Sequence, residues 1–209
     1  MEYSGTWKEI WTQKGEMEGT IDDLYVYDGW EKSKADIQVT AERISVELDI
    51  RSEDKVLEVG CGAGALAQHM HCRYYGIDYS QSLIKKHMEF FGNPVICAEA
   101  NDIPFKDKYF DICFCWGVFL YFDSHQYAQE VIKEMKRVTR KAILIGELPI
   151  TSHDKKHLLY QKNMFPDWVI QDAWTETYKN KRFIITWKNE REEIEGDNSI
   201  RRIYHEMEK

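Results

Sequence analysis

The spacing of apolar residues changes several times along the chain. Between residues 33 and 49 they recur every three or four positions, at Ile37, Ala41, Ile44 and Leu48. This spacing predicts an amphipathic helix. The preceding stretch, up to about residue 34, mixes aromatic and charged residues with weak periodicity, which predicts short helices and loops.

Short apolar runs then alternate with segments of helical spacing. Strands are predicted over residues 55–59, 74–78, 94–98, 110–116 and 141–146, and helices over 65–70, 81–91 and 124–138, with Ser80 as an N-cap. The run at 110–116 is almost wholly apolar, as a parallel strand buried on both faces should be. The alternation predicts βαβ units and a parallel sheet with helices on both faces.

The last sixty residues are more polar. A helix-like stretch follows Pro149 as far as Trp168, and two closing strands are predicted at 182–188 and 199–205, separated by an acidic turn or short helix. Because no repeat or low-complexity linker interrupts the chain, we predict one domain over residues 1–209. It divides into an N-terminal helical cap or lid (1–50), a core (51–150) and a closing helix with strands (151–209).

Composition narrows the range of partners. The net charge is −8, which disfavours binding to a phosphate backbone, so no nucleic acid is expected. No apolar run approaches the length of about 20 residues that spans a bilayer, and the N-terminus does not resemble a secretory signal, so no membrane partner is expected. The five cysteines form no Cys-x-x-Cys pair, and Cys113 and Cys115 fall in an apolar run, which indicates reduced thiols and a cytoplasmic protein. A monomer or homodimer is expected.

A glycine-rich loop, Gly60-Cys61-Gly62-Ala63-Gly64, follows the first predicted strand. Such a loop lets the backbone approach a ligand closely and points a helix N-terminus at negative charge. Taken alone the signal is weak. Gly60, Gly62 and Ala65 also satisfy the Gly-x-Gly-x-x-Ala pattern of dinucleotide enzymes, and glycines in a tight turn are a third interpretation.

Three acidic residues near the predicted strand ends separate these interpretations. Glu58 stands two residues before the loop, where it would repel a pyrophosphate and attract the ammonium group of an amino acid. Asp78 ends the second strand, eighteen residues after Gly60, where an acid accepts hydrogen bonds from ribose hydroxyls. Glu99 follows the third strand, where it can accept a bond from an adenine amino group.

The segment from about Lys55 to Pro149 resembles the class I S-adenosylmethionine-dependent methyltransferases, small-molecule branch. The resemblance rests on VLEVGCGAG (56–64), YGIDYS (75–80), AEANDIPF (98–105) and FDICFCWGVFLYF (110–122). It implies a three-layer, Rossmann-like α/β sandwich whose seven-stranded sheet is mostly parallel, with a reversed last strand. It also implies S-adenosylmethionine as cofactor, held by Glu58, Gly60, Cys61, Gly62, Gly64, Asp78, Tyr79, Glu99, Ala100, Trp116 and Gly117.

Two features depart from the family pattern. The Pro-Gly-Gly turn that often precedes the fifth strand is absent from residues 137–141, and Leu120 stands where a histidine is frequent. The general base is therefore unknown. The weak candidates are Glu147, Tyr121 and His125, with His153 as a fourth.

Aromatic residues in the N-terminal segment are candidates for a substrate lid, because aromatic faces attract a sulfonium. They are Trp11, Tyr25, Tyr27 and Trp30, and a hydrophobic cluster on the sheet edge is the alternative. No metal is expected, since the His69-x-His71-Cys72 cluster is predicted to lie opposite the site. The favoured function is methyl transfer to a small molecule. The alternatives are a non-catalytic S-adenosylmethionine-binding regulatory or scaffold module and, less favoured, an NAD-dependent oxidoreductase.

Overall fold

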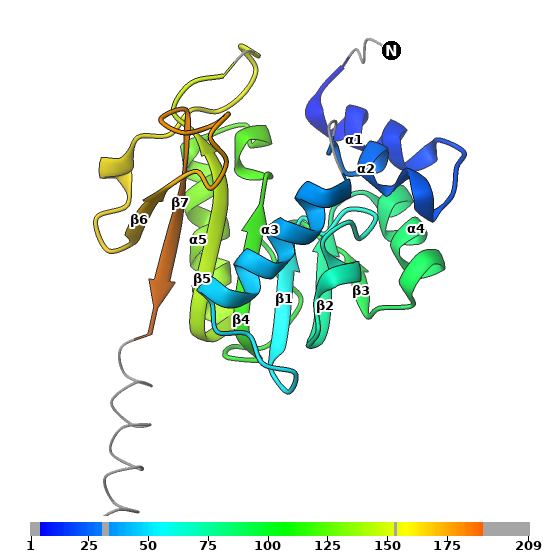
Figure 1. Cartoon of the computed structure of the whole chain (residues 1–209), viewed down its shortest axis with the longest axis horizontal. Coiled ribbons are helices and arrows are strands. Elements are labelled where there is room, and N and C mark those ends of the chain that lie inside the picture. The colour runs from blue at the N-terminus through cyan, green and yellow to red at the C-terminus, as the bar shows by residue number, and fades with distance from the viewer. Residues whose placement is uncertain (1–4, 31–33, 153, 190–209) are drawn as a thin grey trace, which may run out of the picture.

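The computed structural model of the chain describes residues 5–30, 34–152 and 154–189, which form a central sheet with helices on both faces (Figure 1). The strands are β1 (Lys55–Val59), β2 (Arg73–Asp78), β3 (Val95–Cys97), β4 (Phe110–Trp116), β5 (Thr139–Pro149), β6 (Val169–Asp172) and β7 (Arg182–Lys188). Their order across the sheet is β3-β2-β1-β4-β5-β7-β6. The first five strands pair in parallel, whereas β7 is antiparallel to both β5 and β6.

The helices are α1 (Trp7–Glu16), α2 (Leu24–Tyr27), α3 (Lys34–Glu47), α4 (Gln81–Phe91) and α5 (His125–Val138). Serine hydroxyls cap two of them, because Ser80 accepts the Leu83 N–H and Ser124 accepts the Tyr127 N–H. Gly92 ends α4 in a left-handed conformation, with φ of 64°. Short 3₁₀ turns occur at Ile21–Asp23, Ala67–His69, Phe119–Tyr121 and Lys162–Met164.

Side chains alternate between the two faces of the central strands, and each face has its own core. On one face, Ile37 and Ile44 of α3 pack with Ile112 and Phe114 of β4. On the other, α5 packs against Cys113 and Cys115 and their neighbours in β1 and β5. The two cysteines are free and fully buried, as predicted for small apolar residues. Helix α3 therefore crosses one face of the sheet and α5 covers the other (Figure 1).

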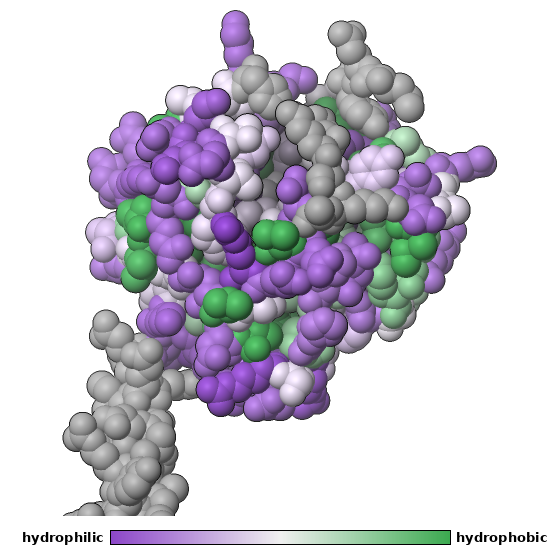
Figure 2. All heavy atoms as spheres, in the orientation of Figure 1, coloured by the Kyte–Doolittle hydropathy of each residue, from purple (hydrophilic) through white to green (hydrophobic). Residues whose placement is uncertain are grey.

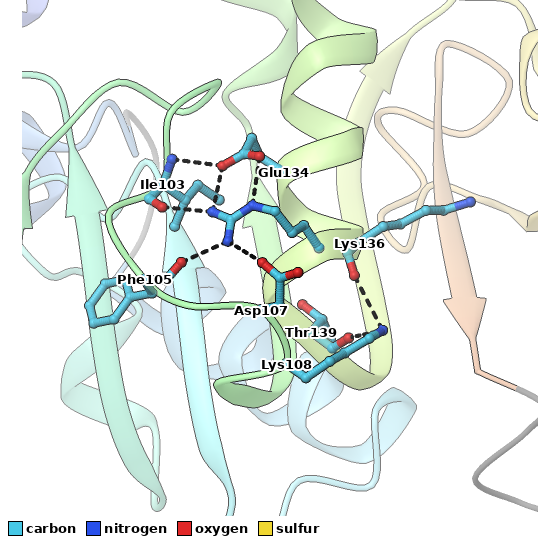
Figure 3. A network of polar contacts seen from close by, with 8 residues as sticks. Ile103, Phe105, Asp107, Lys108, Glu134, Lys136 and Thr139 are labelled. Atoms are coloured by element: carbon cyan, nitrogen blue, oxygen red, sulfur yellow. Dashed lines mark hydrogen bonds and ion pairs between the residues drawn. The ribbon is translucent and has the colours of Figure 1, made fainter.

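Helix α5 runs into β5 without an intervening loop, and Arg137 near its end fastens the segment that follows β3. The guanidinium donates to the carbonyls of Ile103 and Phe105 and to Asp107, each at 2.8 Å. It also forms a two-point pair with Glu134, which in turn accepts the Ile103 N–H at 3.1 Å (Figure 3). The network fixes the loop that begins at Glu99.

Two predicted elements differ in the structure, and one strand was not predicted. Residues 65–70 form only the 3₁₀ turn at Ala67–His69, because the chain enters β2 three residues later. The polar stretch after Pro149 is mostly irregular, and β6 at Val169–Asp172 was not predicted; it is an edge strand of four residues with no residue fully buried. The strand at 182–188 is confirmed as β7, the reversed last strand of a seven-stranded sheet, whereas the strand predicted at 199–205 lies outside the described residues.

The face of the molecule seen in Figure 2 is largely polar. Hydrophobic residues appear in Figure 2 as small, separate patches between polar ones. Val39 and Val46 of α3 are among the exposed apolar side chains. In the described part of the chain, no helix combines the length and apolarity needed to cross a bilayer.

Candidate functional site

A cavity of about 270 Å³ opens at the carboxyl ends of β1, β2 and β4. The sheet order reverses at this edge, since β1 lies between β2 and β4 and the chain leaves it in opposite directions. Ten of the eleven residues predicted to bind cofactor line the cavity, namely Glu58, Gly60, Cys61, Gly62, Asp78, Tyr79, Glu99, Ala100, Trp116 and Gly117. Gly64 does not line it, because it faces His87 and Phe91 of α4.

The glycine loop is packed tightly from both sides. Gly60 and Gly62 have φ values of 78° and 51°, which favour glycine, and a side chain at either position would collide with Val118 or Asp28 respectively. The buried His87 ring lies below the loop, with Nδ1 3.2 Å from the Gly62 carbonyl and Nε2 3.3 Å from the Asn93 amide nitrogen. These contacts suit a neutral ring that donates to Gly62, and burial lowers the pKa of His87 to about 4.

Asp78 organises the loop as well as facing the cavity. Its Oδ2 accepts the Gly62 N–H at 3.0 Å, and its Oδ1 accepts the Ser80 N–H at 2.8 Å. Burial raises the pKa of Asp78 to about 6 in spite of these bonds. The carboxylate keeps lone pairs for further donors, as binding to two ribose hydroxyls requires.

Asp28 is a functional candidate that the sequence analysis missed. It directly follows α2, and its carboxylate accepts the Ala63 and Ala65 N–H groups at 2.7 and 2.8 Å. Burial raises its pKa to about 7, although the loop N–H groups favour the charged form. The sequence holds no signal for this contact, because Asp28 precedes the loop by more than thirty residues in a segment of weak periodicity.

Glu58 is the third acid at this end of the cavity. It is buried on β1 and accepts a hydrogen bond from the Tyr74 hydroxyl at 2.6 Å. Burial raises its pKa well above the usual range, and the charges of Asp28 and Asp78 add to the effect. The three acids lie close enough for charge repulsion to add to the effect of burial on the pKa values of Asp28 and Glu58, and such a cluster of acids is suited to a cation.

The opposite end of the cavity is bounded by Glu99 and Ala100, after β3. Glu99 pairs with Lys8 of α1 at 2.5 Å and accepts a bond from the Tyr127 hydroxyl at 3.1 Å. The Tyr79 hydroxyl donates to the carbonyl of Trp7 at 3.3 Å. Helix α1 is thereby joined to the strand ends on which Tyr79 and Glu99 lie.

Aromatic side chains form the wall beneath α1. The Tyr121 ring lies 4.7 Å from the Trp7 ring and 5.1 Å from the Trp11 ring, both edge-on, and His157 stacks on Trp7 at 5.0 Å. The Trp11 indole N–H is buried and has no hydrogen-bond partner among the described residues. A polar ligand group in the cavity would satisfy this donor.

Two of the four predicted lid residues, Trp11 and Trp30, line the cavity. Tyr25 and Tyr27 do not. Tyr27 is fully buried in a small core with Leu24, Ala63 and Leu83, and Tyr25 packs against the core beneath α3. Their large rings anchor the N-terminal segment instead of covering the site.

Only one of the candidate bases, Tyr121, lines the cavity. Glu147 has a φ of 63° at an irregularity of β5 and forms a short ion pair with Arg182, which occupies its carboxylate. His125 bonds to the carbonyl of Leu159 at 2.8 Å. His153 lies outside the described residues.

Further cavity residues were not predicted, and nearly half of them come from α1 with its N-cap or from the loop after β4. They are Thr6, Trp7, Lys8, Asp28, Leu83, Val118, Phe122, Asp123 and Tyr127, besides Ala65, Leu66, Ile77 and Ala98. The loop residues follow FDICFCWG closely in sequence, so their proximity to a strand end was an available signal. No feature of the sequence predicted where α1 would pack.

Residues 57–144 match the family model described as a methyltransferase domain. Two uncharacterized proteins of Methanocaldococcus jannaschii are similar in sequence. One is 29% identical over 47% of this chain and 38% of its own length, and the other is 36% identical over 43% of this chain and 42% of its own length. The chain thus matches about two fifths of each curated relative.

Solved structures share the fold over most of the chain. The magnesium protoporphyrin IX methyltransferase of Synechocystis, with bound S-adenosylmethionine, has a TM-score of 0.59 at 12% identity and covers 90% of this chain and 100% of that one. A Thermotoga maritima protein described as a possible histamine N-methyltransferase has a TM-score of 0.59 at 14% identity, covering 80% and 96%. Residues 57–144 thus match a methyltransferase domain, and the described chain shares its fold with these solved structures, around a sheet of order β3-β2-β1-β4-β5-β7-β6.

Proposed function

We propose that the protein transfers the methyl group of S-adenosylmethionine to a small-molecule acceptor. The observation that carries this proposal is the cavity itself. It combines the glycine loop, Asp78 and Glu99 with an aromatic wall in a single space of about 270 Å³. A space of this size beneath α1 suits a cofactor and a compact acceptor better than a folded macromolecule.

The donor set fits S-adenosylmethionine at both ends. Asp78 would accept the ribose hydroxyls, while Tyr79, Glu99 and Ala100 would hold the adenine. Glu58 lies where the ammonium group of the methionine end would be bound, and Trp116 and Gly117 border that same end. The acidic lining favours a ligand that carries a cationic amino acid over one that carries a pyrophosphate.

When bound, S-adenosylmethionine supplies a methyl group on a positively charged sulfur; the bond from the acceptor to the methyl carbon forms as the carbon–sulfur bond breaks and its electron pair passes to sulfur. The protein's part is to align the acceptor and exclude water. Trp7, Trp11 and Tyr121 would form the walls of the acceptor site, and their ring faces would stabilise positive charge. Tyr121 is the candidate to receive a proton from the acceptor, and it would do so as its phenolate, because Glu147 and His125 do not line the cavity.

Calorimetric titration with S-adenosylmethionine and with S-adenosylhomocysteine tests the cofactor, and a screen of small acceptors for transfer of a labelled methyl group tests the reaction. We expect both ligands to bind and at least one small acceptor to be methylated. Binding of both ligands without transfer to any small molecule would favour the regulatory or scaffold alternative. Failure of both ligands to bind would refute the cofactor assignment.

A further inference from the structure

The glycine loop has no backbone donor left for a ligand. The N–H groups of Gly60 and Cys61 bond to the carbonyl of Ile77 at 2.8 and 3.0 Å, and that of Gly64 bonds to the carbonyl of Cys61 at 3.1 Å. Asp78 takes the N–H of Gly62. Asp28 takes the N–H groups of Ala63 and Ala65, one on each carboxylate oxygen. Each donor from Gly60 to Ala65 is therefore satisfied within the chain.

Asp28 is a fixed part of this arrangement. The preceding residue, Tyr27, is fully buried, and Leu24 at the start of α2 is almost so. The Asp28 N–H closes α2 by bonding to the Leu24 carbonyl at 3.1 Å, and the Trp30 N–H bonds to the Tyr25 carbonyl at 2.7 Å. The Asp28 backbone is therefore held at the end of a helix whose side chains are anchored in a buried core.

The charges at this end of the cavity are all negative. Glu58 and Asp78 are buried, Asp28 is half-buried, and all three line the cavity. Among the lining residues that the structure describes, Lys8 is the one lysine or arginine, and it pairs with Glu99 at the opposite end. A carboxylate placed at the glycine loop would meet no cation and no free N–H, whereas an ammonium would meet acids.

We infer that Asp28 is a specificity-determining residue of the cofactor site: it occupies the amide cradle of the glycine loop, so that the methionine end is recognised through its ammonium group and not through its carboxylate. This inference rests on the proposed function, because it assigns the chemistry of the same site. Asp28 contributes the third carboxylate to the ammonium site and excludes a ligand carboxylate from the loop. The site is thereby selective for the amine of the cofactor.

Comparing S-adenosylmethionine with two analogues separates the contribution of its carboxylate to binding from that of its ammonium group. Decarboxylated S-adenosylmethionine lacks the carboxylate, and 5′-methylthioadenosine lacks the whole amino acid, including the ammonium. With the unmodified protein we expect the decarboxylated ligand to bind within about threefold of S-adenosylmethionine, and methylthioadenosine to bind more weakly by about tenfold or more. Decarboxylation that weakens binding by more than about tenfold would overturn the inference without any variant.

The variant Asp28→Asn removes the charge and keeps one acceptor oxygen. We expect it to weaken both amine-containing ligands by about tenfold or more and to change methylthioadenosine binding by less than about twofold. Glu16→Gln, at an exposed acid of α1, is the matched control and should change the affinity for none of the three ligands. Equal weakening of all three ligands, or no change in any, would overturn the role of Asp28. Failure of the unmodified protein to bind S-adenosylmethionine would instead refute the proposed function.

Discussion

Some side chains at the site both hold the glycine loop in place and face the ligand cavity. Asp78 is the clearest case, because one carboxylate holds the N–H groups of Gly62 and Ser80 and still faces the cavity. Its substitution therefore acts on the shape of the loop as well as on the ligand. The effects are separable, because an amide retains one acceptor oxygen and an alanine retains none.

We predict that Asp78→Asn weakens S-adenosylmethionine binding about tenfold and that Asp78→Ala weakens it by about a hundredfold or more. Each charge-assisted hydrogen bond to the ribose contributes about 1.5–3 kcal/mol, and the alanine variant also releases the loop. Calorimetry measures the change. Asp102→Asn, an exposed residue after β3, is the control. Affinity equal to that of the unmodified protein in the alanine variant would show that Asp78 does not contact the ligand.

The acids also predict how affinity varies with pH. In the free protein, burial raises the pKa values of Asp28 and Asp78 to about 7 and about 6, and it also raises the pKa of Glu58 well above its usual value. A bound ammonium favours the charged carboxylates, so binding must release protons in this range. The neighbouring His87, with its pKa lowered to about 4, stays neutral throughout.

Affinity for S-adenosylmethionine should therefore rise between pH 5.5 and 7.5, by about threefold or more. Calorimetry in two buffers of different ionisation enthalpy measures the protons released. Methylthioadenosine, which lacks the ammonium, should show a smaller dependence. Affinity that falls as the pH rises would contradict the assignment of these acids to the cationic end of the ligand.

At the scale of the element, α1 covers the cavity because one glycine lets it approach α4. Gly15 is buried, and a β-carbon there would lie 2.6 Å from the Leu83 backbone nitrogen. The Ser82 hydroxyl bonds to the Thr12 carbonyl at 2.8 Å across the same contact. The position of α1 on α4 thus depends on the absence of a β-carbon at Gly15.

Gly15→Ala should shift α1 away from α4 and speed S-adenosylmethionine release by about tenfold. Alanine favours the helix itself by about 0.5–1 kcal/mol, but the collision with backbone costs about 1–3 kcal/mol. Stopped-flow tryptophan fluorescence measures the release rate, since Trp7, Trp11 and Trp30 line the cavity. Gln13→Ala, exposed on the same helix, should leave the rate unchanged. An unchanged rate in the Gly15 variant would show that α1 does not control release.

The junction of α5 and β5 yields a prediction about stability. Arg137→Met removes the two-point pair with Glu134, the guanidinium donor to the Phe105 carbonyl and one of the two donors to the Ile103 carbonyl, which keeps the Phe105 N–H (Figure 3). Because the Arg137 side chain is 29% exposed, water compensates for part of the loss, and we expect the free energy of unfolding to fall by about 2 kcal/mol. Urea unfolding measures it. Lys133→Met, exposed on the same helix, should change it by less than about 0.5 kcal/mol.

At the scale of the whole molecule, the sequence predicts the sheet better than the parts that cover it. The apolar runs at 110–116 and 141–146 became central strands because burial on both faces leaves little choice of residue. The four-residue edge strand β6 has no such run and was missed. The helix expected after the glycine loop shrank to one turn, because the chain between Ala65 and Arg73 is too short for more.

The residues of the candidate site likewise include some that the sequence predicts and some that it does not. Glu58, Asp78 and the glycines are identified by their distance from strand ends, which sequence spacing encodes. Asp28 and Trp7 reach the cavity through tertiary packing of the N-terminal segment, which spacing does not encode. Tyr25 and Tyr27 show the converse, since aromatic composition alone does not distinguish a ring that anchors a segment from one that faces a ligand.

The position of Asp28 outside the family match, which spans residues 57–144, has a consequence for engineering. The sheet and glycine loop form one module, and the segment that completes the cavity is joined to it covalently only through α3. Exchanging that segment between related chains would therefore graft a different ligand preference onto an unaltered sheet. Chimeras cut within the loop between α3 and β1 would be the natural starting library for redirecting this scaffold to other methyl donors and acceptors.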